Sequence, residues 1–166
     1  MIFVIMGMEV HPFDRLARGV DAYAASGAAG EELYVQLGAC TYQPTHCRTE
    51  RYLGFGQVCE AIRAASVVIT HAGAGSTLVC IQQGKHPIMV PRRARLGEHV
   101  DEHQVPFAGK LRAAGLATVV SEMDELASAI AAVRGRTAPE NALGAARELV
   151  GWLEGYWSTL RSRGGA

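Results

Sequence analysis

The sequence predicts an α/β fold in which a Rossmann-like parallel sheet is covered by helices on both faces. Short apolar runs alternate with amphipathic stretches over residues 1–121, a pattern typical of strands joined by crossover helices. A loop of small residues, 71–76, joins one apolar run to a helix. The chain has 166 residues and 49% hydrophobic content, enough for one core. We therefore expect one domain over 1–166, with C-terminal helices over 122–166.

The individual elements follow from the same alternation. Short apolar runs bounded by turn residues predict buried strands, and apolar residues recurring at helical spacing predict helices. Gly135, Thr137 and Pro139 separate the last two helices. The expected strands are 2–6, 33–37, 65–70, 87–90 and 117–120, and the expected helices are 13–26, 57–64, 76–83, 100–114, 123–134 and 139–161.

Four loops follow the expected strands and should lie together. Right-handed crossovers place the carboxyl ends of parallel strands at one edge of the sheet, where ligands bind. A ligand is therefore expected among loops 7–12, 38–47, 71–76 and 92–104.

The loop 71–76 is suited to hold an anion. Ser76 is expected to cap the following helix, whose first backbone N–H groups have no internal partners and carry a partial positive charge. Gly73 and Gly75 allow a ligand to approach the backbone. His71 is expected to donate to a phosphate or a backbone carbonyl, with a general-base role as the alternative. Small residues that only permit a tight turn are a second interpretation of this loop.

The loop 92–104 is rich in hydrogen-bonding groups. Arginines hold phosphate, whereas acidic and amide side chains suit sugar hydroxyls, so the loop fits a phosphorylated sugar. A charged surface loop is the alternative. His99 and His103, together with Asp101 and Glu98, offer a metal site as an alternative, but such a site is not expected because no third ligand appears at a helical repeat elsewhere. The polar residues are Arg92, Arg93, Arg95, Glu98, His99, Asp101, Glu102, His103 and Gln104.

Several other classes are disfavoured. The Rossmann dinucleotide motif fails because its third glycine would fall at Leu78, and Gly84-Lys85 is followed by His86 rather than the Ser or Thr of a P-loop. Lysine and arginine number 16, as do acidic residues, so a nucleic-acid partner is not expected. The four cysteines have irregular spacing, which argues for reduced thiols. The apolar start has no basic flank, and we expect a cytoplasmic protein.

Three motifs occur in order: VVITHAGAGST at 67–77, GKHPIMVPR at 84–92 and GEHVDEHQ at 97–104. Together they resemble the C-terminal half of GT-B glycosyltransferases of the family 28 type. The chain is most similar to the small subunits of split two-chain enzymes, namely bacterial exopolysaccharide and capsule transferases and the eukaryotic dolichol-linked chitobiose synthase. The resemblance covers about residues 1–120, including the opening IFVIMGMEVHPFDRL.

This resemblance implies a single GT-B lobe that binds a UDP-sugar. No cofactor is expected, and the sequence has no Asp-x-Asp motif, so no metal ion is expected either. The diphosphate would lie near the Gly7 turn and the loop 71–76, and the loop 92–104 would reach the sugar. Family members often carry a ribose-binding Glu where Val79 stands, and a Thr near Met8. The residues expected to bind the donor are Gly7, His71, Gly73, Ala74, Gly75, Ser76, Arg92, Glu98, His103 and Gln104.

The resemblance also implies an inverting hexosyl transfer in which the acceptor hydroxyl attacks and UDP leaves. His11 and Glu98 are the catalytic candidates, with His11 as a possible base. Because a GT-B enzyme needs two lobes, we expect a second, membrane-associated chain that binds a polyprenyl-linked acceptor and brings this one to the inner face of the membrane. The aromatic segment 149–160 either packs on this domain or meets a partner, which includes a homodimer.

Two alternatives belong to other functional classes. A noncatalytic nucleotide-binding or regulatory module is compatible with Met8 and Val79. A sugar-nucleotide epimerase shares the GT-B architecture but needs both lobes in one chain.

Overall fold

The computed structural model describes residues 1–145, 148 and 151–152. Six parallel strands form one sheet in the order β3-β2-β1-β4-β5-β6. They are β1 (Ile2–Ile5), β2 (Leu33–Gln36), β3 (Arg48–Glu50), β4 (Val67–Thr70), β5 (Ile88–Met89) and β6 (Thr118–Val119). The predicted α/β fold class is confirmed.

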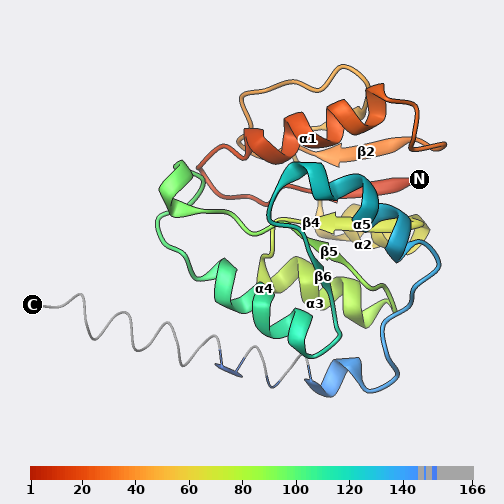
Figure 1. Ribbon diagram of the computed structural model, residues 1–166, viewed down its shortest axis with the longest axis vertical. Helices are drawn as coiled ribbons and strands as arrows, with labels where there is room; N and C mark the ends of the chain where they lie inside the picture. The colour runs from red at the N-terminus through yellow and green to blue at the C-terminus, as the bar shows by residue number, and fades with distance from the viewer. Residues whose placement is uncertain (146–147, 149–150, 153–166) are drawn as a thin grey trace, which may run out of the picture.

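The helices connect these strands and cover both faces of the sheet (Figure 1). Two short 3-10 turns, η1 (Ala94–Leu96) and η2 (Met123–Glu125), precede the last two long helices. The helices are α1 (Asp14–Ala25), α2 (Phe55–Ala64), α3 (Ala74–Gln82), α4 (Gln104–Ala113) and α5 (Leu126–Val133).

Alternation along β1 divides the core between the two faces. Ile2 and Val4 pack with α1 and α5, whereas Phe3 and Ile5 pack with Ile62 of α2. These β1 side chains are at most 3% exposed, as expected for a strand covered on both sides. Helices α3 and α4 lie side by side (Figure 1) and enclose a third apolar cluster around Phe107 and Leu111.

Strand order reverses between β1 and β4. The chain runs outward from β1 through β2 to β3, and from β4 through β5 to β6 in the opposite direction. Open α/β sheets bind ligands at such a switch point, where two loops part to opposite faces. Here those loops follow Ile5 and Thr70, which lie side by side in register.

Several predicted boundaries were wrong. Strand β3 was assigned to a loop, because its exposed Arg48 and Glu50 give no apolar pattern. Helix α4 begins at Gln104 rather than at residue 100, since Asp101 bonds the backbone N–H of His103 instead of continuing a helix. Of the predicted helix 139–161, residues 142–145, 148 and 151–152 are described and helical.

The described C-terminal residues pack on the domain. Trp152 lies against the α3–α4 cluster, and the Lys110 ammonium is 4.5 Å from its ring centre. Most of the aromatic segment 149–160 lies outside the described residues, so its proposed partner surface stays a prediction. No described helix has both the length and the apolar character needed to cross a bilayer.

Candidate functional site

His71 stands at the switch point between two glycine loops. A Cβ atom at Gly7 would lie 2.7 Å from His71 Nε2, and one at Gly73 would lie 2.3 Å from the same atom. Gly7 also has a φ of +88°, which disfavours other residues. Both glycines are therefore required for the ring to sit between the loops that follow β1 and β4.

The imidazole of His71 is oriented by the backbone. Its Nδ1 lies 3.2 Å from the Ile5 carbonyl oxygen, which only accepts, so Nδ1 carries the hydrogen and Nε2 a lone pair. Burial, and then the positive charge of Arg92, lower the pKa of His71 to about 4. The ring is neutral at pH 7 and offers a ligand an acceptor at Nε2. His71 was expected to donate either to a phosphate or to a backbone carbonyl, and in the structure it donates to the backbone carbonyl of Ile5.

Helix α3 presents its N-terminus beside this ring. It starts at Ala74, with extended Gly73 as the N-cap residue, so the prediction that Ser76 caps it was wrong. The Ser76 hydroxyl instead donates to the Gly73 carbonyl at 3.1 Å and pairs with Thr70 Oγ1 at 2.8 Å. The N–H groups of Ala74, Gly75 and Ser76 lie in the first turn, where no carbonyl of the helix can reach them. An anion is favoured there.

A largely apolar cavity of about 650 Å³ lies on one side of this N-terminus. Gly75 and Ser76 border it, and Phe55 at the start of α2 stands at its edge with 74% of its surface exposed. Among the described residues that line this cavity, Gln36 is the only one with an amide side chain. The apolar lining consists mainly of Ile5, Met8, Leu53, Phe55, Val58 and Val79.

A second, polar cavity of about 420 Å³ lies on the other side. It shares His71 and Gly75 with the apolar cavity. Of the residues predicted to bind a ligand, this cavity brings together His71, Gly73, Ala74, Gly75, His103 and Gln104, with His99, Asp101 and Glu9 beside them.

Gln104 links the polar cavity to the strand beside it. Its side-chain oxygen accepts from the Arg92 backbone N–H at 3.0 Å. The amide nitrogen has no hydrogen-bond partner within the described part of the chain, and the residue lines the cavity. Gln104 is thus fixed at one end and has a free donor at the other.

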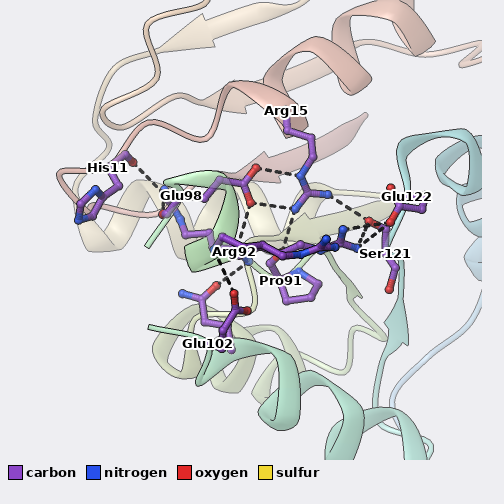
Figure 2. A network of polar contacts seen from close by, with 11 residues as sticks. His11, Arg15, Pro91, Arg92, Glu98, Glu102, Ser121 and Glu122 are labelled. Atoms are coloured by element: carbon purple, nitrogen blue, oxygen red, sulfur yellow. Dashed lines mark hydrogen bonds and ion pairs between the residues drawn. The ribbon is translucent and has the colours of Figure 1, made fainter. Parts of the chain in front are cut away.

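Arg92 does not face either cavity. Its side chain is fully buried, and Nη1 and Nη2 donate to three carbonyls, those of His11 and Glu98 (2.7 and 2.8 Å) and of Met6 (2.7 Å). Figure 2 shows the guanidinium side chain running through the network between the loops. These three bonds give Arg92 a structural role between the loops, and its contact with phosphate stays a prediction.

Glu98 is also occupied within the protein (Figure 2). Arg15 forms a two-point ion pair with its carboxylate, at 2.8 Å and 3.0 Å, and the Arg93 backbone N–H donates at 3.0 Å. The side chain is buried and lines neither cavity. Both carboxylate oxygens are paired within the protein, and the roles of Glu98 in catalysis and sugar binding stay predictions.

His11 lies in the loop after β1, and its carbonyl accepts from Arg92. Its ring borders neither described cavity, so a base role for it stays a prediction. His99, Asp101 and His103 offer ligand atoms within 4.8 Å of one another. Asp101 contacts both imidazoles, and the two rings pack edge to face with their centroids 4.7 Å apart.

The fold and the sequence were compared with known proteins. The model of the glycosyltransferase family 28 C-terminal domain matches residues 1–146. A comparison with curated proteins gave no match.

Solved structures with the same fold are glycosyltransferases. The chain superposes on CalG4, the calicheamicin glycosyltransferase (TM-score 0.57, 15% identity), covering 89% of this chain and 37% of that one. It also superposes on the spinosyn rhamnosyltransferase SpnG (TM-score 0.55, 19% identity), covering 93% of this chain and 41% of that one. A third match is the kitacinnamycin glycosyltransferase (TM-score 0.55, 16% identity), covering 98% of this chain and 41% of that one. The chain thus spans about two fifths of these proteins. On the family match, it belongs to the glycosyltransferase family 28 C-terminal domain family.

Proposed function

We propose that this chain is the donor-binding part of an inverting UDP-sugar glycosyltransferase that adds a hexose to a polyprenyl-linked acceptor in exopolysaccharide or capsule synthesis. The observation that carries the proposal is the pair of cavities that meet at the N-terminus of α3. Both volumes fall within the usual range of small-molecule sites, about 300–1,000 Å³. One is apolar and the other polar, which matches the two ends of a nucleotide sugar.

A UDP-sugar fits this arrangement with its nucleoside in the apolar cavity and its sugar in the polar one. The diphosphate lies over the free N–H groups of Ala74, Gly75 and Ser76, where the helix favours negative charge. The nucleoside enters the apolar cavity, and the sugar enters the polar one. There His103 and the Gln104 amide nitrogen are placed to contact hydroxyl groups.

Catalysis then depends on stabilising the leaving group. The acceptor oxygen forms a bond to the anomeric carbon while the bond to the UDP oxygen breaks, and the electron pair goes to the diphosphate. Backbone N–H groups that already point at that position stabilise the growing charge without reorganising. The proton of the acceptor hydroxyl passes to a base, either His11 or a group on the acceptor-binding partner. We expect no metal ion in this step.

The acceptor side is assigned to a second, membrane-associated polypeptide. This chain spans about two fifths of the glycosyltransferases that share its fold, and a GT-B site needs a second lobe. Through that partner the chain would work at the cytoplasmic face of the membrane. A noncatalytic nucleotide-binding module is the second candidate, because Val79 lines the apolar cavity where family members often carry a ribose-binding Glu.

Calorimetric titration of the full chain with UDP, GDP, ADP and NAD tests the donor site. We expect binding selective for UDP, lost in a Gly75→Val, Ser76→Ala double variant. Preference for NAD, or no binding of UDP, would reject the proposed donor site. Sugar transfer that appears only when a candidate acceptor subunit is added separates the enzyme from the noncatalytic module.

A further inference from the structure

One polar side chain in the apolar cavity has no partner in the fold. Gln36, the last residue of β2, is 3% exposed and lines the cavity. No hydrogen bond to its side-chain amide is formed within the described residues. Because buried amides are nearly always hydrogen-bonded, the partner of this one must come from what fills the cavity, either water or a bound ligand.

The sheet register places Gln36 at a defined distance from the anion site. Gln36 pairs with Ile5 of β1, and Ile5 pairs with Thr70 of β4. Thr70 contacts Ser76 in the first turn of α3. Adjacent strands lie about 4.8 Å apart, so Gln36 is two strand spacings, roughly 10 Å, from Thr70. A ribose bridges such a gap between a phosphate and a base.

The two faces of β2 explain why this amide points into the cavity. Leu33 and Val35 pack with the α1 side of the sheet, whereas Tyr34 packs with the α2 side. Side chains alternate along a strand, so Gln36 shares the α2 face with Tyr34. The cavity lies on that face, beside Phe55 and Val58 of α2.

We propose that the Gln36 amide recognises the nucleobase of the donor, accepting from N3–H and donating to O4 of a uracil ring. This inference rests on the proposed function and adds the residue that reads the base. A glutamine amide carries one acceptor and two donor hydrogens, which pair with that edge. The apolar walls, with Phe55 at the edge, contact the ring faces. The base is thereby selected by one polar contact in an otherwise apolar site.

A chemical double-mutant cycle tests this pairing. The affinities of UDP and of N3-methyl-UDP, which lacks the N3–H donor, are measured for the wild-type chain and for Gln36→Leu. Removing the paired hydrogen bonds should weaken UDP binding roughly ten- to hundredfold in the variant. N3-methylation should weaken wild-type binding by a similar factor and should cost the variant little. Gln82→Leu, the same change at an exposed α3 position, is the matched control and should bind UDP like the wild type.

The outcomes separate the two proposals. If the wild type binds UDP and Gln36→Leu binds it equally well, the role of Gln36 is overturned while the donor site stands. If N3-methylation weakens both proteins equally, another group reads the base and the inference again fails. If the wild type does not bind UDP, the proposed function fails first. If the wild type binds N3-methyl-UDP as tightly as UDP, the inference fails whether or not Gln36→Leu folds.

Discussion

Substitutions at Gly75 should stabilise the fold when the new residue is alanine and damage the candidate site when it is valine. The residue lies in the first turn of α3, and a Cβ atom there would meet nothing within 4 Å. Alanine is favoured over glycine in a helix by up to about 1 kcal/mol. For a chain of this size, Gly75→Ala should therefore raise Tm by roughly 2–4 °C or slightly less.

Gly75 also lines both cavities. A larger side chain there would displace the proposed diphosphate from the N–H groups of α3. Hydrogen bonds to charged groups contribute roughly 1.5–3 kcal/mol each. Gly75→Val should accordingly lose about 2–3 kcal/mol of UDP binding, roughly 30- to 150-fold in Kd.

Thermal unfolding of the same samples checks the expected rise in Tm, and calorimetric titration checks the expected loss of UDP affinity. Gly109→Ala in α4 is the matched control, because a Cβ atom there also meets nothing within 4 Å and Gly109 borders neither cavity. It should gain stability without changing the affinity for UDP. Wild-type affinity in Gly75→Val would refute the assignment of the diphosphate to this turn.

Three further outcomes follow. Unfolded His71 titrates near pH 6.5 and the folded residue near 4, so the unfolded state takes up more protons in between and stability falls as pH drops from 6.5 to 4. Between pH 7 and 4.5, urea unfolding should show that His71→Gln removes up to about 3 kcal/mol of this loss in the free energy of unfolding. An unchanged pH dependence of stability in His71→Gln would contradict the lowered pKa of His71. Arg92→Met leaves three carbonyls unpaired and should cost about 3 kcal/mol or more, and a loss below about 1 kcal/mol in urea unfolding would disprove the structural role. Chelation with EDTA should not change UDP affinity, whereas a loss restored by Mn²⁺ would assign a cation to His99, Asp101 and His103.

The sequence predicted the strands and helices of the fold better than the contacts of the charged loop 92–104. Alternating apolar runs indicated the central strands, since strands buried on both faces must be apolar. The short edge strand β3 has charged Arg48 and Glu50 and was missed for that reason. The N-terminus of α3 was placed too late because Gly73, which has no side chain to signal a cap, occupies the N-cap position.

Within the candidate site, burial separates the predicted residues that line a cavity from those that are enclosed by the protein. Arg92 and Glu98 were expected to face a ligand, because arginine holds phosphate and acidic side chains suit sugar hydroxyls. Their partners come from segments distant in sequence, such as Arg15 and the Met6 carbonyl, and no local spacing reveals them. Gln36 was missed for the opposite reason, because at the end of an apolar run it resembles any strand residue.

The way Arg92 holds the loop after β1 bears on how this surface can change during evolution. The guanidinium bonds the main-chain carbonyls of Met6 and His11, whose positions do not depend on side-chain identity. Between them, Met8 and Val10 are 73% and 82% exposed. Residues 8–10 can therefore vary with little effect on the path of the loop. A fixed backbone with interchangeable side chains lets this rim acquire new surface contacts by point substitution, while the path of the loop beside His71 is preserved.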